Sequence, residues 1–121
     1  MKAGDTFLPL LRNTHLWVIL SDPDLDSERI VLVNLTTYTI DEESHCILQK
    51  GDHPFVRHKT AVRYEEARIV SSAELSKLLK NHLTQRERMS GAVLKRIRDG
   101  ASKSDRLREE CRRVLDEQGL I

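Results

Sequence analysis

Cysteines, aromatic residues and long apolar runs are all scarce in this sequence of 121 residues. Its two cysteines, Cys46 and Cys111, belong to no C-x-x-C pair, which excludes zinc ribbons and redox motifs of that spacing and favours a reduced, cytosolic setting. Aromatic residues make up 4% of the chain, which leaves few rings to stack on bases. The longest purely apolar run, Leu16 to Leu20, is far shorter than the roughly 20 residues that cross a bilayer, so we expect neither secretion nor membrane insertion.

The sequence also lacks the motifs of several common active sites. It contains no G-x-x-x-x-G-K-[ST] or G-x-G-x-x-G phosphate loop, no G-x-S-x-G elbow and no H-E-x-x-H helix, so nucleotide-dependent and zinc chemistry have no support. Three of the five histidines, His45, His53 and His58, are close in the sequence, but their spacing matches no zinc template. We therefore expect neither a metal ion nor another cofactor.

The charged residues are distributed unevenly although the net charge is only +1. Residues 1 to 72 carry 8 basic and 11 acidic side chains, whereas residues 73 to 121 carry 12 basic and 8 acidic ones. A basic C-terminal part can attract a polyanion or an acidic partner. A solvated helical surface gives the same counts, so the charge alone does not identify a nucleic-acid site.

Short apolar segments separated by turn residues predict strands in the first 70 residues. Strands at such short intervals are typical of a small barrel. We expect them at Gly4 to Pro9, Leu16 to Leu20, Arg29 to Leu35, His45 to Gln49, Ala61 to Tyr64 and Arg68 to Val70.

After Val70 the spacing of the apolar residues changes from that of a strand to that of a helix. Ser71 and Glu74 have the spacing of a capping box, and the apolar positions that follow predict a first helix. A second helix is expected from about Ser90 to a stop at Gly100, and a third from about residue 105 to residue 118. The sequence thus predicts one α+β domain, in which residues 1–72 form the barrel and residues 73–121 form a helical extension packed on or beside it.

Arg63 and Glu65 lie two residues apart in an expected strand. Because side chains alternate along a strand, these two project from one face while Val62 and Tyr64 project from the other. The pair is either a reactive arrangement of a guanidinium and a carboxylate or an ordinary surface ion pair, which contributes little stability.

Three motifs in this order resemble those of the MazF/PemK family of toxins from toxin-antitoxin pairs. They are Gly4-Asp5 followed by HLWVILS (residues 15–21), then VLVNLT (residues 31–36), then TAVRYEEARIV (residues 60–70). The resemblance covers roughly residues 4 to 71. It implies a small SH3-like β-barrel over residues 4–71 followed by C-terminal helices.

The resemblance also implies an activity, a site and partners. Members of the family are endoribonucleases that cleave single-stranded RNA without a metal ion, form dimers and are bound by an antitoxin, which implies a cytoplasmic homodimer here. Their catalytic positions fall on His15, Thr36, Arg63 and Glu65. In such a reaction a base takes the proton of the ribose 2′-hydroxyl, a cation stabilises the phosphorane and an acid protonates the leaving 5′-oxygen.

Two differences from the family pattern leave a second function open. His15-Leu16 stands where the family has Arg-Pro, and the short segment of residues 10–14 replaces a glycine-rich loop. A barrel that keeps the fold but binds protein or nucleic acid without cleavage is therefore the alternative, and a DNA-binding regulator that uses the basic helices is a weaker one. The segment of residues 49–59 adds secondary candidates for substrate contact, with Phe55 as an apolar anchor: His53, Arg57, His58 and Lys59.

Overall fold

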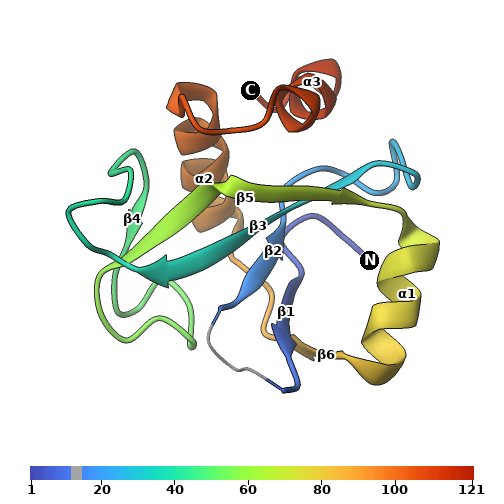
Figure 1. Cartoon of the computed structure of the whole chain (residues 1–121), viewed down its shortest axis with the longest axis horizontal. Helices are drawn as coiled ribbons and strands as arrows, with labels where there is room; N and C mark the ends of the chain where they lie inside the picture. Colours follow the sequence, from blue (N-terminus) through green and yellow to red (C-terminus); the bar gives the residue numbers. More distant parts are fainter. Residues whose placement is uncertain (12–14) are drawn as a thin grey trace.

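The computed structural model describes residues 1–11 and 15–121 as an α+β fold, with a six-stranded antiparallel sheet and three helices (Figure 1). The strands lie in the order β4-β5-β3-β2-β1-β6. The elements along the chain are β1 (Thr6–Pro9), β2 (Trp17–Ile19), β3 (Ile30–Thr37), β4 (Ile47–Leu48), β5 (Thr60–Val70), α1 (Ser72–Asn81), β6 (Leu83–Arg86), α2 (Gly91–Lys103) and α3 (Glu109–Glu117).

The strands lie near the predicted segments, β4 being shortened to two residues and β1 beginning at Thr6, and they differ from the prediction most in two places. The two segments expected around residues 61–64 and 68–70 form one continuous strand, β5. Strand β6, in a region expected to be helical, was not predicted because its sequence LTQR has no apolar alternation; it exists through its pairing with β1. Among the described residues no pairing joins β4 to β6, so the sheet is open and its closure into an SH3-like barrel stays a prediction.

The pairing of β3 with β5 contains a large bulge. Two steps along β3, from Leu32 to Asn34, lie opposite five steps along β5, from Arg68 to Arg63. Extra residues on one strand bend it and increase its twist. Strand β5 accordingly changes direction along its length in Figure 1.

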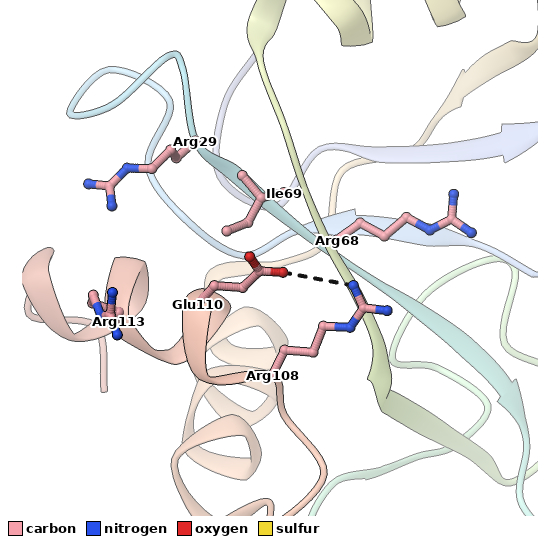
Figure 2. A pocket seen from close by; sticks show the side chains of 6 residues that line it. All are labelled: Arg29, Arg68, Ile69, Arg108, Glu110 and Arg113. Atoms are coloured by element: carbon pink, nitrogen blue, oxygen red, sulfur yellow. Dashed lines mark ion pairs between the residues drawn. The ribbon is translucent and has the colours of Figure 1, made fainter.

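Each face of the sheet has its own apolar cluster. Alternate residues of β3, Val31, Val33 and Leu35, face a large cluster that includes residues of α2 and α3. Ile30 and Leu32 face a smaller cluster with Leu75 of α1. Burial of one such side chain stabilises the fold by about 1.5–3 kcal/mol. Because β3 supplies side chains to both clusters, the helices on both faces of the sheet pack against this one strand. Helix α3 lies beside β5 on the first face (Figure 2).

All three expected helices form, although α3 begins at Glu109 rather than near residue 105. The capping box of α1 is present: the Ser71 hydroxyl accepts from the Glu74 N–H, and the Glu74 carboxylate accepts from the Ser71 N–H. Helix α2 begins after Ser90, whose hydroxyl accepts from the Val93 N–H. None of the helices that the structure describes is long and apolar enough to cross a membrane.

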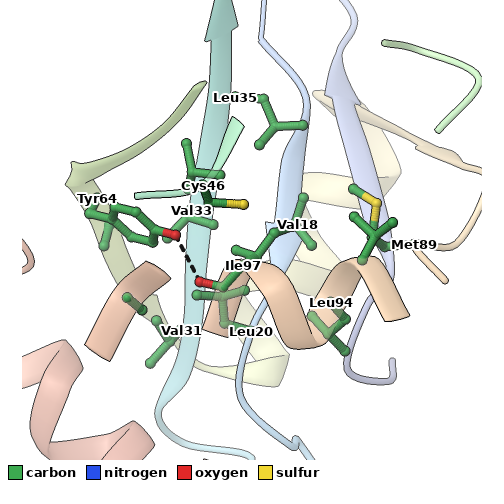
Figure 3. Close-up of a cluster of buried hydrophobic side chains, with 14 of the residues drawn as sticks. Val18, Leu20, Val31, Val33, Leu35, Cys46, Tyr64, Met89, Leu94 and Ile97 are labelled. Carbon is green, nitrogen blue, oxygen red and sulfur yellow. Dashed lines mark hydrogen bonds between the residues drawn. The ribbon is translucent and has the colours of Figure 1, made fainter. Parts of the chain in front are cut away.

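Gly100 does not end α2, as the sequence analysis expected; the helix continues to Lys103. The buried Tyr64 hydroxyl donates a 2.8 Å hydrogen bond to the Ile97 carbonyl one turn earlier, as Figure 3 shows. A Cβ atom at position 100 would overlap the Tyr64 hydroxyl and approach the Cys46 Cβ atom to 2.9 Å. Glycine at this position therefore lets α2 lie close to β5, rather than serving as a helix stop.

The substitution Gly100→Ala is expected to lower the free energy of unfolding by about 1–3 kcal/mol, because overpacking against Tyr64 outweighs a gain of about 1 kcal/mol in helix propensity. Urea denaturation measures the change. Gly91→Ala is the matched control, since a Cβ at that position of the same helix would have no contact within 4 Å among the described residues outside its own helix turn. A Gly100→Ala protein as stable as the parent would contradict the close approach.

Both cysteines are buried and free. Burial raises the pKa of the Cys46 and Cys111 thiols from 9.0 to about 11. Each thiol therefore behaves as a small apolar group, as the position of Cys111 on the apolar stripe of α3 predicts.

At pH 8 the native thiols are expected to react with a soluble disulfide reagent at least about 100-fold more slowly than in urea, because the thiolate fraction is lower and access is blocked. Because the thiol pKa is higher in the folded than in the unfolded protein, the stabilisation is fully present below pH 9.0, the unfolded pKa. It is lost as the pH rises toward the folded pKa of about 11. The unfolding free energy should fall in that window. Fast modification of the native protein at pH 8 would show that the thiols are accessible.

Candidate functional site

Part of the sheet face opposite α2 and α3 carries the residues that the family resemblance selects. Asn34 pairs with Trp17 on one side and with Arg63 on the other, and Thr36 pairs with Ala61. Directly paired residues of an antiparallel ladder project to the same face, and so do residues two apart on one strand. Thr36 and Arg63 are therefore diagonal neighbours on one face of the sheet.

His15 lies next to the same end of β3. The Leu35 N–H donates to the Leu16 carbonyl at 3.0 Å, which continues the pairing of β2 and β3 toward Thr36. The His15 Nδ1 atom lies 3.0 Å from the Leu35 carbonyl oxygen. Because a carbonyl only accepts, Nδ1 carries the hydrogen, and in the neutral ring Nε2 is the unprotonated nitrogen.

Arg63 and Glu65 do project from one face, as alternation predicts, and their charged atoms are 3.9 Å apart. Arg63 also forms ion pairs with Glu42 at 3.9 Å and Glu66 at 3.6 Å. Glu65 in turn accepts a 3.2 Å hydrogen bond from Arg106. Arg63 is thus surrounded by three carboxylates, and Glu65 lies between two guanidinium groups.

Two buried polar atoms beside these ion pairs have no hydrogen-bond partner among the described residues. They are the Nε atom of Arg63 and the Oδ1 atom of its cross-strand neighbour Asn34, which is only 5% exposed. Such groups cost free energy when unpaired. Asn34 was not among the predicted site residues. Its only sequence signal is that a polar residue stands inside the apolar strand VLVNLT.

A hollow of about 150 Å³ lies at the end of β3 and brings Thr36 together with two of the secondary candidates. The His58 Nε2 atom lies 3.0 Å from the Thr37 hydroxyl. Phe55 packs against the core and so anchors the segment above the strand end, as expected. The lining residues are Leu35, Thr36, Thr37, Phe55, Arg57, His58 and Thr60.

The other two secondary candidates do not line this hollow. His53 is 4% exposed; its Nε2 atom hydrogen-bonds the Glu87 carbonyl, and its Nδ1 atom accepts from the Phe55 N–H at 3.1 Å. Both ring nitrogens are therefore engaged in holding the segment of residues 49–59 in place. The Lys59 side chain is exposed, and its backbone carbonyl accepts from the Tyr38 N–H.

The segment that replaces the glycine-rich loop lies largely outside the described residues, since residues 12–14 are not part of them. Within residues 1–11 and 15–121, no three His, Cys, Asp or Glu side chains gather into a group that would hold a metal ion. No protein-family model matches the chain, and the comparisons with curated proteins and with solved structures give no match either.

Replacing Arg63 by Met should destabilise the protein by about 1 kcal/mol at low salt, because Glu42, Glu65 and Glu66 then repel one another without a central cation. Urea denaturation in low salt and in 1 M NaCl measures the loss, which should shrink at high salt. Arg86→Met is the control, since in the described part of the chain Arg86 pairs with a single exposed carboxylate, that of Glu87. An equal, salt-independent loss in both variants would show that charge is not the cause.

Proposed function

We propose that the protein is a cytosolic endoribonuclease of the MazF/PemK kind, which cleaves single-stranded RNA without a metal ion and acts as a homodimer regulated by an antitoxin. The observation that supports it best is the shared location of His15 and Thr36 at the end of β3, beside a hollow lined by Arg57 and His58. A base, hydroxyl groups and a cation at one place are what cleavage through the 2′-hydroxyl requires. The bent β5 strand is compatible with the SH3-like barrel that the family would have.

The proposed chemistry assigns each group a step. The unprotonated Nε2 atom of His15 takes the proton of the ribose 2′-hydroxyl, and the 2′-oxygen forms a bond to phosphorus. Arg57 and the Thr36 hydroxyl hold the phosphate oxygens as negative charge develops. His58 gives a proton to the 5′-oxygen as the P–O5′ bond breaks, which leaves a 2′,3′-cyclic phosphate and a 5′-hydroxyl.

Arg63 and Glu65 take a positioning role in this proposal. Arg63 is already held by three carboxylates, and Glu65 by two guanidinium groups, so neither side chain is free to bind phosphate alone. They lie on the same face as Thr36, next to Asn34, and there they would orient the strand of RNA that crosses the sheet.

The test is incubation of the purified protein with single-stranded RNA in excess EDTA. We expect fragments with 2′,3′-cyclic phosphate ends, and a loss of rate of about 100-fold or more in His15→Ala and Thr36→Val, since a positioned acid or base contributes about 10²–10⁴-fold. An oligonucleotide that carries 2′-O-methyl groups should stay intact. Electrophoresis and end analysis measure both results.

His82→Ala and Thr84→Val are matched controls for these variants, because both residues are exposed and lie in or next to β6, at the opposite edge of the sheet order from β5. Both should cleave at the parent rate. Intact RNA at high protein concentration, or equal losses in the control variants, would refute the catalytic proposal.

A second candidate function is a non-catalytic binding module. It is favoured by the acidic surroundings of Arg63, whose three carboxylate neighbours oppose the approach of a phosphate. In this case the RNA of the same experiment stays intact in the parent protein, and His15→Ala leaves binding of the partner unchanged.

A further inference from the structure

A cavity lined mainly by arginines lies at the free edge of β5, away from the hollow at the end of β3. Its volume is about 690 Å³, within the range of ligand sites in proteins. Figure 2 shows that β5 contributes Arg68 and Ile69, that α3 contributes Glu110 and Arg113, and that Arg108 stands at the start of α3. The lining residues are Arg29, Arg68, Ile69, Arg108, Glu110 and Arg113.

The carboxylates around this cavity do not neutralise it. Arg29 is matched by Asp26 and Glu117 at 2.8 and 2.6 Å. Among the residues that the structure describes, Arg108 has only a long ion pair with Glu110, at 3.8 Å between exposed side chains. Within the described residues, Arg68 and Arg113 have no carboxylate within 4.0 Å, so the cavity keeps a net positive charge.

Arg68 connects this cavity to an apolar cleft. Its guanidinium carbon lies 5.3 Å from the centroid of the Trp17 ring, the distance of a cation–π contact. The cleft has a volume of about 220 Å³ and lies between β1, β2, β5 and α1. Its lining residues are Phe7, Pro9, Trp17, Leu32, Arg68, Val70, Leu78 and Leu83.

We infer that this edge of the sheet binds single-stranded RNA, with phosphates in the arginine cavity and a base in the cleft beside Trp17. Arginine presents a planar fork of donors that fits phosphate oxygens, and all four cations here are arginines. A nucleic-acid strand alternates anionic phosphates with flat, weakly polar bases, and the two neighbouring hollows offer the complementary surfaces in that order. An acidic peptide would fill only the charged one.

This inference rests on the proposed function for RNA rather than DNA as the ligand, but it does not require cleavage. Trp17 pairs with Asn34, and Asn34 lies next to Arg63 and Thr36 on the same face, so a strand that leaves the cleft passes toward the hollow at the end of β3. The site would hold RNA even in a protein that cannot cut it.

The experiment measures binding of a fluorescently labelled ten-nucleotide RNA by anisotropy, in EDTA and at several salt concentrations, with RNA carrying 2′-O-methyl groups so that cleavage does not interfere. The variant is Arg108→Ala with Arg113→Ala, two exposed side chains whose removal leaves the core intact. We expect at least about tenfold weaker binding at 0.1 M salt and a salt slope smaller by about 1.4, since each phosphate contact on a single strand contributes about 0.7.

Lys77→Ala with Lys80→Ala is the control of equal charge, on exposed positions of α1 outside both hollows. Its affinity should fall by less than about twofold, whereas equal weakening in the two double variants would overturn the site. Urea denaturation of each variant verifies that it is folded. The single reversal Arg113→Glu is a second variant and should weaken binding too.

Trp17, the only tryptophan, distinguishes RNA from other anions. RNA should quench its fluorescence because a base stacks near the ring, and inorganic phosphate should not. Poly-glutamate that competes as well as RNA, or RNA binding without quenching, would overturn the assignment to nucleic acid. Failure of the cleavage proposal gives a separate result, namely unmodified RNA that binds and quenches but stays intact.

Discussion

The pairing of β3 with β5 is the constraint on which both layers of packing depend. β3 is central in the sheet and is buried from Ile30 to Leu35, so its alternate side chains supply the apolar surface for α2 and α3 on one face and for α1 on the other. β5 keeps β3 away from the sheet edge and carries Tyr64, whose hydroxyl reaches the backbone of α2. Loss of this ladder would separate the helices from each other and from the site.

The sequence predicted those elements whose signals are local. Ser71 and Glu74 mark the start of α1 through contacts within four residues, and the apolar runs mark the strands. Strand β6 and the role of Gly100 were missed, because each depends on a distant partner: β6 on β1, and Gly100 on Tyr64 and Cys46. No pattern within ten residues contains that information.

In the candidate site, too, local features could be predicted from the sequence and contacts between distant segments could not. Alternation along one strand correctly placed Arg63 and Glu65 on one face, since it depends on two neighbouring residues only. Alternation gives no information on Glu42 and Arg106, which belong to other segments and form ion pairs with Arg63 and Glu65. The burial of His53 could not be predicted from the sequence. Its position in a polar loop suggests exposure, whereas its ring is buried and hydrogen-bonds to backbone groups.

The bulge in β5 decides which side of the sheet each arginine occupies. Arg63 and Arg68 are an odd number of positions apart, so in a regular strand they would point to opposite sides. Because five steps of β5 match two of β3, the parity is reversed and both project from the face that carries Trp17 and Asn34. The shared face of the two arginines therefore depends on the pairing with β3 at both ends of the bulge, and not on the number of residues between them alone.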